Sequence, residues 1–197
     1  IHSGTLMLPE VKAAMLAASN QFVNMDDLMH GVGQRLAELT GAEWGMVSSG
    51  AAAALCHATA AFVTGGDPEK MLRLPNTEGL KNRVVMMDDG RFTYDQAIRT
   101  VGVEVVNVTP ETLEDALDDR VALVALLGSR EATRLDVFEQ TVALAKSRGI
   151  PVLVDAASEH LQSPDPYLSR GATLVAYSGG KYLRGPQPSG LLLGEKK

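Results

Sequence analysis

The chain has 197 residues, 45% of them hydrophobic and 21% charged, with a formal net charge of −6. These values are typical of one globular domain with a sizeable core, and the single cysteine excludes an internal disulfide and fits a reducing compartment. No apolar run approaches the ~18 residues of a membrane span, and the N-terminus lacks a basic-then-apolar signal pattern, so we expect a cytoplasmic protein without membrane segments.

Helical and strand patterns follow one another along the whole chain. Two helical patterns come first, at residues 9–19 and 25–40, and strand-like apolar runs then lie at 44–48, 84–87, 103–107, 121–127, 152–155, 174–177 and 190–193. Because most of these runs alternate with helices, they predict a three-layer α/β/α fold around a mostly parallel seven-stranded sheet. The last two runs flank a loop without a helix, which permits an antiparallel pair, and residues 65–82 are typical of an extended connection.

The first candidate binding segment is Ser49-Gly50-Ala51, where a strand ends before an alanine-rich helix. Free amides at a helix N-terminus, together with the helix dipole, favour a phosphate group. The same residues are also simply a good helix start.

A carboxylate ends the buried run at residues 152–155. Asp155 would face the crevice at the carboxyl edge of a parallel sheet, where ligands bind in open α/β folds. It could instead cap the helix that follows.

The segment from Ser178 to Gln187 contains a lysine in an unusual place. Lys181 follows a strand-like run and is preceded by two glycines, which leave room for a ligand beside its amine. A crowded lysine loses proton affinity and can then form a Schiff base. A glycine-rich turn with an ordinary surface lysine fits this segment equally well, and Ser178 can likewise be read as a strand-end turn.

Two arginines are candidates for binding an anionic group of a substrate. Arg91 follows the second apolar run, and its guanidinium could bind a carboxylate or phosphate bidentately or pair locally with Asp88 or Asp89. Arg184 could contact the substrate or a neighbouring subunit, or could also pair locally.

Combined in this order, these segments resemble fold type I enzymes that use pyridoxal 5′-phosphate. The likeness is to the selenocysteine synthase-like branch, which includes D-glucosaminate-6-phosphate ammonia-lyases, and it covers nearly the whole chain. It rests on residues 4–5, 9–11, 38–43, 49–54, 79–82, 94–95, 154–157, 178–187 and 190–191. The run Gly180-Lys181 to Gln187 is its most specific part.

The resemblance implies that Lys181 forms a Schiff base with pyridoxal phosphate and that Asp155 pairs with the pyridinium nitrogen. The segment Ser49-Gly50-Ala51 would hold the phosphate, and Ser178 could add a hydroxyl. A buried carboxylate keeps the ring nitrogen protonated, as the cofactor's electron-sink role requires, and a displaced Lys181 is a natural base for the substrate α-proton. No residue is assigned to a metal. The loop Asp88-Asp89-Gly90 departs from the family pattern, since we expect a histidine or another ring-stacking side chain there.

The implied activity is that of a pyridoxal phosphate-dependent lyase acting on an amino acid or amino sugar acid, with β-elimination and ammonia release as the leading chemistry. Aldol cleavage, racemisation or transamination would use the same anchors. An L-seryl-tRNA(Sec) selenium transferase-like activity is an alternative, but an acidic chain without a lysine-arginine cluster does not suit a nucleic acid. A non-catalytic structural relative is another, against which the intact Lys181 and Asp155 argue.

The resemblance also predicts domain organisation and assembly. Such enzymes place their active site at a dimer interface, so we expect a homodimer or higher homo-oligomer that binds a small molecule and no membrane or nucleic acid. We expect residues 1–40 to form an N-terminal helical segment and residues 41–197 an aspartate aminotransferase-like large domain that binds the cofactor. The chain stops soon after residue 193, so we expect a fragment that lacks the C-terminal small domain.

Overall fold

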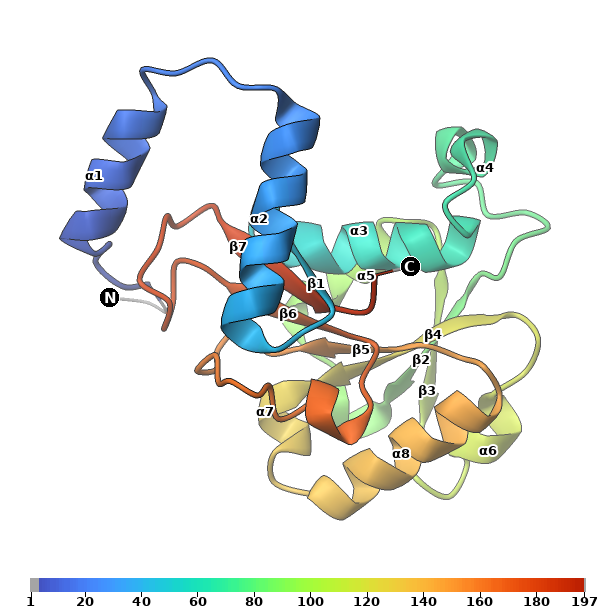
Figure 1. Cartoon of the computed structure of the whole chain (residues 1–197). Coiled ribbons are helices and arrows are strands. Elements are labelled where there is room, and N and C mark those ends of the chain that lie inside the picture. Colours follow the sequence, from blue (N-terminus) through green and yellow to red (C-terminus); the bar gives the residue numbers. More distant parts are fainter. Residues whose placement is uncertain (1–3, 197) are drawn as a thin grey trace.

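A single seven-stranded sheet organises residues 4–196, the part of the chain that the computed structural model describes (Figure 1). Its strands lie in the order β1-β7-β6-β5-β4-β2-β3. Their bounds are Trp44–Ser48 (β1), Arg83–Met87 (β2), Glu104–Val108 (β3), Val121–Leu127 (β4), Val152–Asp155 (β5), Leu174–Ser178 (β6) and Gly190–Gly194 (β7). The pairs from β6 to β3 are parallel, whereas β7 is antiparallel to both β6 and β1. The expected mostly parallel sheet is confirmed, and the last pair is indeed antiparallel.

Helices cover both faces of this sheet. Their bounds are Pro9–Ala18 (α1), Met25–Thr40 (α2), Ala51–Thr64 (α3), Pro68–Arg73 (α4), Gln96–Arg99 (α5), Leu113–Ala116 (α6), Gly128–Glu131 (α7) and Leu135–Ser147 (α8), with short 3₁₀ turns at Asp88–Gly90, Thr93–Asp95 and Leu168–Arg170. Figure 1 shows α3 and α5 on one face and α6 and α8 on the other. The three-layer α/β/α architecture is therefore confirmed.

The central strands are apolar up to their carboxyl ends because neither face of the sheet meets water there. In β4, Leu123 packs in the cluster on the α3 side, and its neighbour Val124 packs on the α8 side. In β5, Leu153 likewise packs on the α3 side and Val154 on the α8 side. This two-sided burial explains why β4 and β5 are continuous apolar runs rather than alternating ones.

The expected extended connection over residues 65–82 is wrong in one part, because it contains helix α4. Asp67 accepts hydrogen bonds from the amides of Glu69 (2.9 Å) and Lys70 (3.3 Å), and Pro68 occupies the first helical position. An aspartate N-cap followed by proline is a helix-start signal. The expectation of an extended connection overlooked this helix-start signal at Asp67-Pro68.

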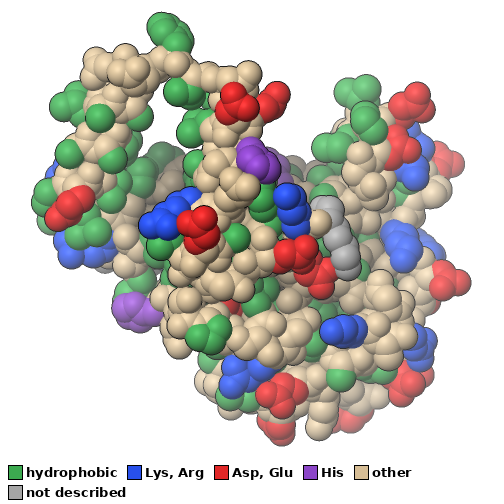
Figure 2. All heavy atoms as spheres, viewed as in Figure 1, with side chains coloured by type: hydrophobic (Ala, Val, Ile, Leu, Met, Phe, Trp, Pro, Cys, Tyr) green, Lys and Arg blue, Asp and Glu red, His purple; other side chains and the backbone are tan. Residues whose placement is uncertain are grey.

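The two N-terminal helices differ in how they meet the sheet. Helix α2 packs on β1, where Gly33 lies against the ring of Trp44, and Asn24 caps its first turn. Helix α1 has no buried residue and stands apart from the sheet, with exposed hydrophobic side chains along it and the connection to α2 (Figures 1 and 2). The proposed division after residue 40 stays a prediction. No helix in residues 4–196 is long and apolar enough to cross a membrane.

Replacement of Gly33 by Ala should destabilise the protein by about 1–3 kcal/mol, the usual cost of overpacking. The added methyl would lie 2.3 Å from Trp44 Cε2 and Cζ2, so the helix must move off the strand. Gly31→Ala is the matched control on the same helix, because its methyl meets no atom within 4 Å. The control should gain up to about 1 kcal/mol of stability from better helix propensity. Urea unfolding followed by Trp44 fluorescence measures both, and equal effects of the two changes would contradict the packing argument.

Candidate active site

A cavity of about 180 Å³ opens at the carboxyl edge of the sheet. It is lined by Gly50, Ala51, Ala52, Leu55, Tyr94, Asp155, Ala157, Ser178 and Lys181. Asp155 is the last residue of β5 and Ser178 the last of β6, so two parallel strands deliver their final side chains to one place. Five of the six cofactor residues expected from the sequence meet here. Ser49 is the exception, because it is exposed and does not line the cavity.

The N-terminus of α3 forms one wall of this cavity. Gly50 precedes the helix with φ 105° and ψ 162°, a conformation that side chains disfavour, and no side chain caps the helix. Strand β7 passes directly beside this turn, since a methyl on Gly190 would lie 2.4 Å from the Gly50 carbonyl carbon and 2.6 Å from the Ala51 nitrogen. The first amides of α3 are thus held at the cavity without a side-chain acceptor. This arrangement suits an anion.

Asp155 is a buried carboxylate with 5% of its surface exposed. Its Oδ1 accepts a hydrogen bond from the Ala157 amide at 2.9 Å. Burial raises its pKa, while the Ala157 amide and the charge of Lys181 act in the opposite direction. Within residues 4–196, Asp155 forms no ion pair shorter than 4.0 Å. A buried carboxylate in this state favours a ligand that brings a proton or a positive charge.

The backbone around Lys181 is held from both sides. On one side, the Thr5 hydroxyl donates to the Lys181 carbonyl at 2.6 Å, and the Thr5 amide donates to the Gly180 carbonyl at 3.1 Å. On the other, Gln187 Nε2 donates to the Gly180 carbonyl at 2.9 Å and to the Thr5 carbonyl at 3.0 Å. Lys181 therefore projects from a fixed loop rather than from a free turn.

Tyr94 is a cavity residue that the sequence reasoning did not assign to the site. Its ring centroid lies 5.9 Å from Lys181 Nζ, and 62% of the residue is exposed. The next residue, Asp95, is buried and receives hydrogen bonds from Arg91 and Arg99, which fix the turn that presents the ring. No local sequence pattern marks this position, because the burial of Asp95 and its contacts with Arg91 and Arg99 appear only in the fold. The expectation of a ring-stacking residue had been placed at Asp88–Gly90 instead.

The two candidate substrate arginines lie outside the cavity lining. Arg91 donates to Asp95 Oδ2 and to Asn107 Oδ1 at 2.9 Å, and so pairs locally, though not with Asp88 or Asp89. Asp89 instead binds Arg130 and Arg134. The roles expected of Arg91 in substrate binding stay a prediction.

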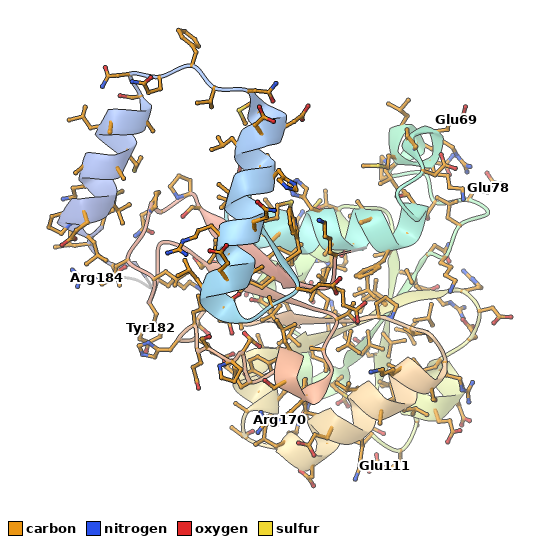
Figure 3. All side chains as sticks on the ribbon, viewed as in Figure 1. Glu69, Glu78, Glu111, Arg170, Tyr182 and Arg184 are labelled. Atoms are coloured by element: carbon orange, nitrogen blue, oxygen red, sulfur yellow. The ribbon has the colours of Figure 1, made fainter. Side chains whose placement is uncertain are left out.

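Arg184 connects the lysine loop to the N-terminal segment. Its Nε donates to the Leu6 carbonyl at 3.3 Å, and its φ of 53° lies in the left-handed region. Figure 3 shows Arg184 beside the base of α1, with Tyr182 on the same loop. The Tyr182 ring lies against the His160 ring, with centroids 3.7 Å apart and planes tilted by 37°. A substrate contact for Arg184 likewise stays a prediction.

Comparison with known proteins places this geometry in context. No family model matches the chain. D-glucosaminate-6-phosphate ammonia lyase of Salmonella typhimurium is 31% identical over 200 residues, which cover 95% of this chain and 53% of that protein. A 5′-C-glycyluridine monooxygenase-decarboxylase of a Streptomyces species is 34% identical over 97% of this chain and 51% of its own length. The chain therefore spans about half the length of these relatives.

Solved structures agree with the sequence relatives. A structure of D-glucosaminate-6-phosphate ammonia-lyase superposes with a TM-score of 0.89 at 30% identity, over 98% of this chain and 55% of that one. Aspartate aminotransferase of Thermus thermophilus shares the fold, with a TM-score of 0.66 at 17% identity over 98% of this chain and 55% of its own. Over the part that it spans, the chain is a homologue of D-glucosaminate-6-phosphate ammonia lyase and shares its fold.

Proposed function

We propose that the cavity holds pyridoxal phosphate and that the protein is a lyase that releases ammonia from an amino sugar acid or a related amino acid. The observation that carries this proposal is the meeting of Lys181 and Asp155 in one cavity beside the open N-terminus of α3. The similarity to an ammonia lyase over 95% of the chain supports the reaction class.

The residues present fit the cofactor group by group. The uncapped amides of α3 suit its phosphate, with the Ser178 hydroxyl beside them. Asp155, buried and without an ion-pair partner in the described residues, suits a protonated ring nitrogen. The ring of Tyr94 offers a flat surface for stacking, a role that the loop Asp88–Gly90 cannot fill.

Each of these side chains then has a part in the reaction. When bound, the cofactor supplies a conjugated ring that stabilises negative charge at the substrate α-carbon. Lys181 would hold the cofactor through its amine, and the same amine would serve as the base for the substrate α-proton. Asp155 holds the proton on the ring nitrogen, and Tyr94 keeps the ring plane oriented.

A decarboxylation is the second candidate, because the relative named as a monooxygenase-decarboxylase is as similar to this chain as the ammonia lyase is. The same Lys181 and Asp155 would serve it. A transferase acting on a transfer RNA is less well supported, since the net charge of −6 opposes binding to phosphates. We also propose a cytoplasmic homodimer or higher homo-oligomer, the assembly that the family resemblance implies.

Replacement of Lys181 by Ala in the full-length protein should abolish the visible absorption that pyridoxal phosphate gives on forming a Schiff base. It should also abolish release of ammonia and a 2-oxo acid from phosphorylated amino sugar acids. Lys12→Ala, on the exposed helix α1, is the control and should retain both. Release of carbon dioxide in place of ammonia would favour the second candidate. A wild-type protein without any visible band would overturn the proposal.

Asp155→Asn should stabilise the cofactor-free protein near neutral pH and weaken cofactor binding. The folded-state pKa of Asp155 is raised by burial, so its ionised form lowers stability as pH rises through that value. Asn keeps the acceptor for the Ala157 amide but carries no charge. The gain in free energy of unfolding should therefore appear near neutral pH and vanish in acid, where the wild-type carboxyl is protonated in both states. Urea unfolding across this range measures it, and a gain independent of pH would be inconsistent with a desolvated carboxylate.

Tyr94→Ala should weaken cofactor binding by about 3- to 10-fold, the scale of an aromatic stacking contact. Tyr94→Phe should bind as the wild type does, because the stacking surface remains. Absorbance titration with pyridoxal phosphate gives both dissociation constants. A Phe variant as weak as the Ala variant would show that the hydroxyl, not the ring, matters.

A further inference from the structure

Two hydrogen bonds between tyrosines and carboxylates hold the connection that follows Asp155. The Tyr167 hydroxyl donates to Glu159 Oε2 at 2.5 Å, and the Tyr177 hydroxyl donates to Asp165 Oδ2 at 2.6 Å. Tyr167, Tyr177 and Asp165 are each at most 3% exposed. Asp165 Oδ1 also accepts the amide of Tyr167 at 2.9 Å. The chain between β5 and β6 is thus fixed by buried side chains rather than by regular secondary structure.

Glu159 connects this network to the turn that carries Asp155. Its amide donates to the Ala156 carbonyl at 3.0 Å, so it closes the turn in which the Ala157 amide binds the Asp155 carboxylate. Its side chain reaches back to Tyr167. A shift of Glu159 would therefore move this turn and, through the Ala157 amide, the Asp155 carboxylate.

The far end of this connection is rigid. The Tyr167 ring packs edge-on against Phe138 of α8, with centroids 5.5 Å apart and planes at 69°. Phe138 is fully buried, with no exposed surface. Tyr167 is therefore held in place by α8, and its hydroxyl in turn holds the Glu159 carboxylate.

A second contact comes from β4 through Gly128, the first residue of α7. A methyl on Gly128 would lie 2.3 Å from Glu159 Oε1, 3.0 Å from the Tyr167 hydroxyl and 3.1 Å from the Asp155 carbonyl oxygen. Three oxygens of the network and of the site thus converge on one Cα. Only glycine leaves them enough space at this position.

Glu159 also lowers the stability of the fold at this position. Its Oε1 is buried and has no hydrogen-bond partner within residues 4–196. Burial, followed by the negative charges of Asp155 and Asp165, raises its pKa, against the hydrogen bond from Tyr167. An unsatisfied buried oxygen lowers stability, and such a cost is typical of functional positions.

We propose that Glu159 and Tyr167 are positioning residues for Asp155, holding the turn after β5 so that the Asp155 carboxylate faces the ring nitrogen of the cofactor. This inference rests on the proposed function and extends it to residues that do not line the cavity. In this role, Glu159 and Tyr167 act through Asp155 and do not themselves contact the cofactor or the substrate.

The test is a set of variants in the full-length protein: Glu159→Ala, Glu159→Gln, Tyr167→Phe and Gly128→Ala. Each is titrated with pyridoxal phosphate, and the pH midpoint of the visible band is measured, because that midpoint reports the groups around the ring.

Glu159→Ala and Tyr167→Phe should weaken cofactor binding by roughly tenfold, the scale seen for outer carboxylates at metal sites, and should shift the midpoint in the same direction. Glu159→Gln should keep most of the cofactor affinity and a pH midpoint near that of the wild type, because its amide oxygen can accept a hydrogen bond from the Tyr167 hydroxyl. Glu69→Ala, on α4 and remote in Figure 3, is the control.

Combining variants separates positioning from a general loss of stability. Gly128→Ala alone should resemble Glu159→Ala, because its methyl displaces the Glu159 carboxyl. The double variant Gly128→Ala/Glu159→Ala should be no worse than Glu159→Ala, since the methyl then fills the vacated space. Normal binding and an unshifted midpoint in folded Glu159→Ala and Tyr167→Phe would overturn the inference while leaving the proposed function intact. Lower thermal stability with an unchanged midpoint would also overturn it, in favour of a structural role. A wild-type protein that binds no cofactor would overturn both.

Discussion

The close approach of β7 to the N-terminus of α3 is the constraint on which the site depends. Gly190 lies so near Gly50 and the Ala51 nitrogen that no side chain fits between them. Because β7 is inserted antiparallel between β1 and β6, it fixes the start of α3 relative to the end of β6. The loop that precedes β7 carries Lys181. One backbone contact therefore sets the spacing between the first amides of α3 and the lysine.

The sequence was sufficient for features encoded locally, and it was insufficient for features that need two distant segments. The strands were predictable because burial on both faces leaves continuous apolar runs. Asp155 was a candidate because it ends such a run, and Lys181 because it follows another run in a glycine-rich loop; their roles stay predictions. Tyr94 was not, since its place in the cavity depends on a turn fixed by the buried Asp95. Nor was the Glu159–Tyr167 hydrogen bond predictable, because an irregular connection has no period from which side-chain directions can be read.

Buried carboxylates at the carboxyl edge of the sheet lower the stability of the fold. Asp155 and Glu159 both have a pKa raised by burial, and one oxygen of Glu159 has no partner within residues 4–196. Apolar residues at these positions would satisfy the core better. The opposite edge of the sheet shows no such conflict near β4, where Val121 is fully buried among apolar neighbours. Both of these carboxylates lie at or just after the carboxyl end of β5, the edge where ligands bind in open α/β folds.

The hydrogen bond between Thr5 and the Lys181 carbonyl joins residues that are 176 positions apart. Leu8, at the start of α1, donates its amide to the Arg184 carbonyl in the same loop. Contacts of such long range form late in folding, because the chain must first close the loop between them. They also mean that the N-terminal segment and the lysine loop open together as one unit. A force applied to the exposed helix α1 would consequently act on the backbone of the lysine itself.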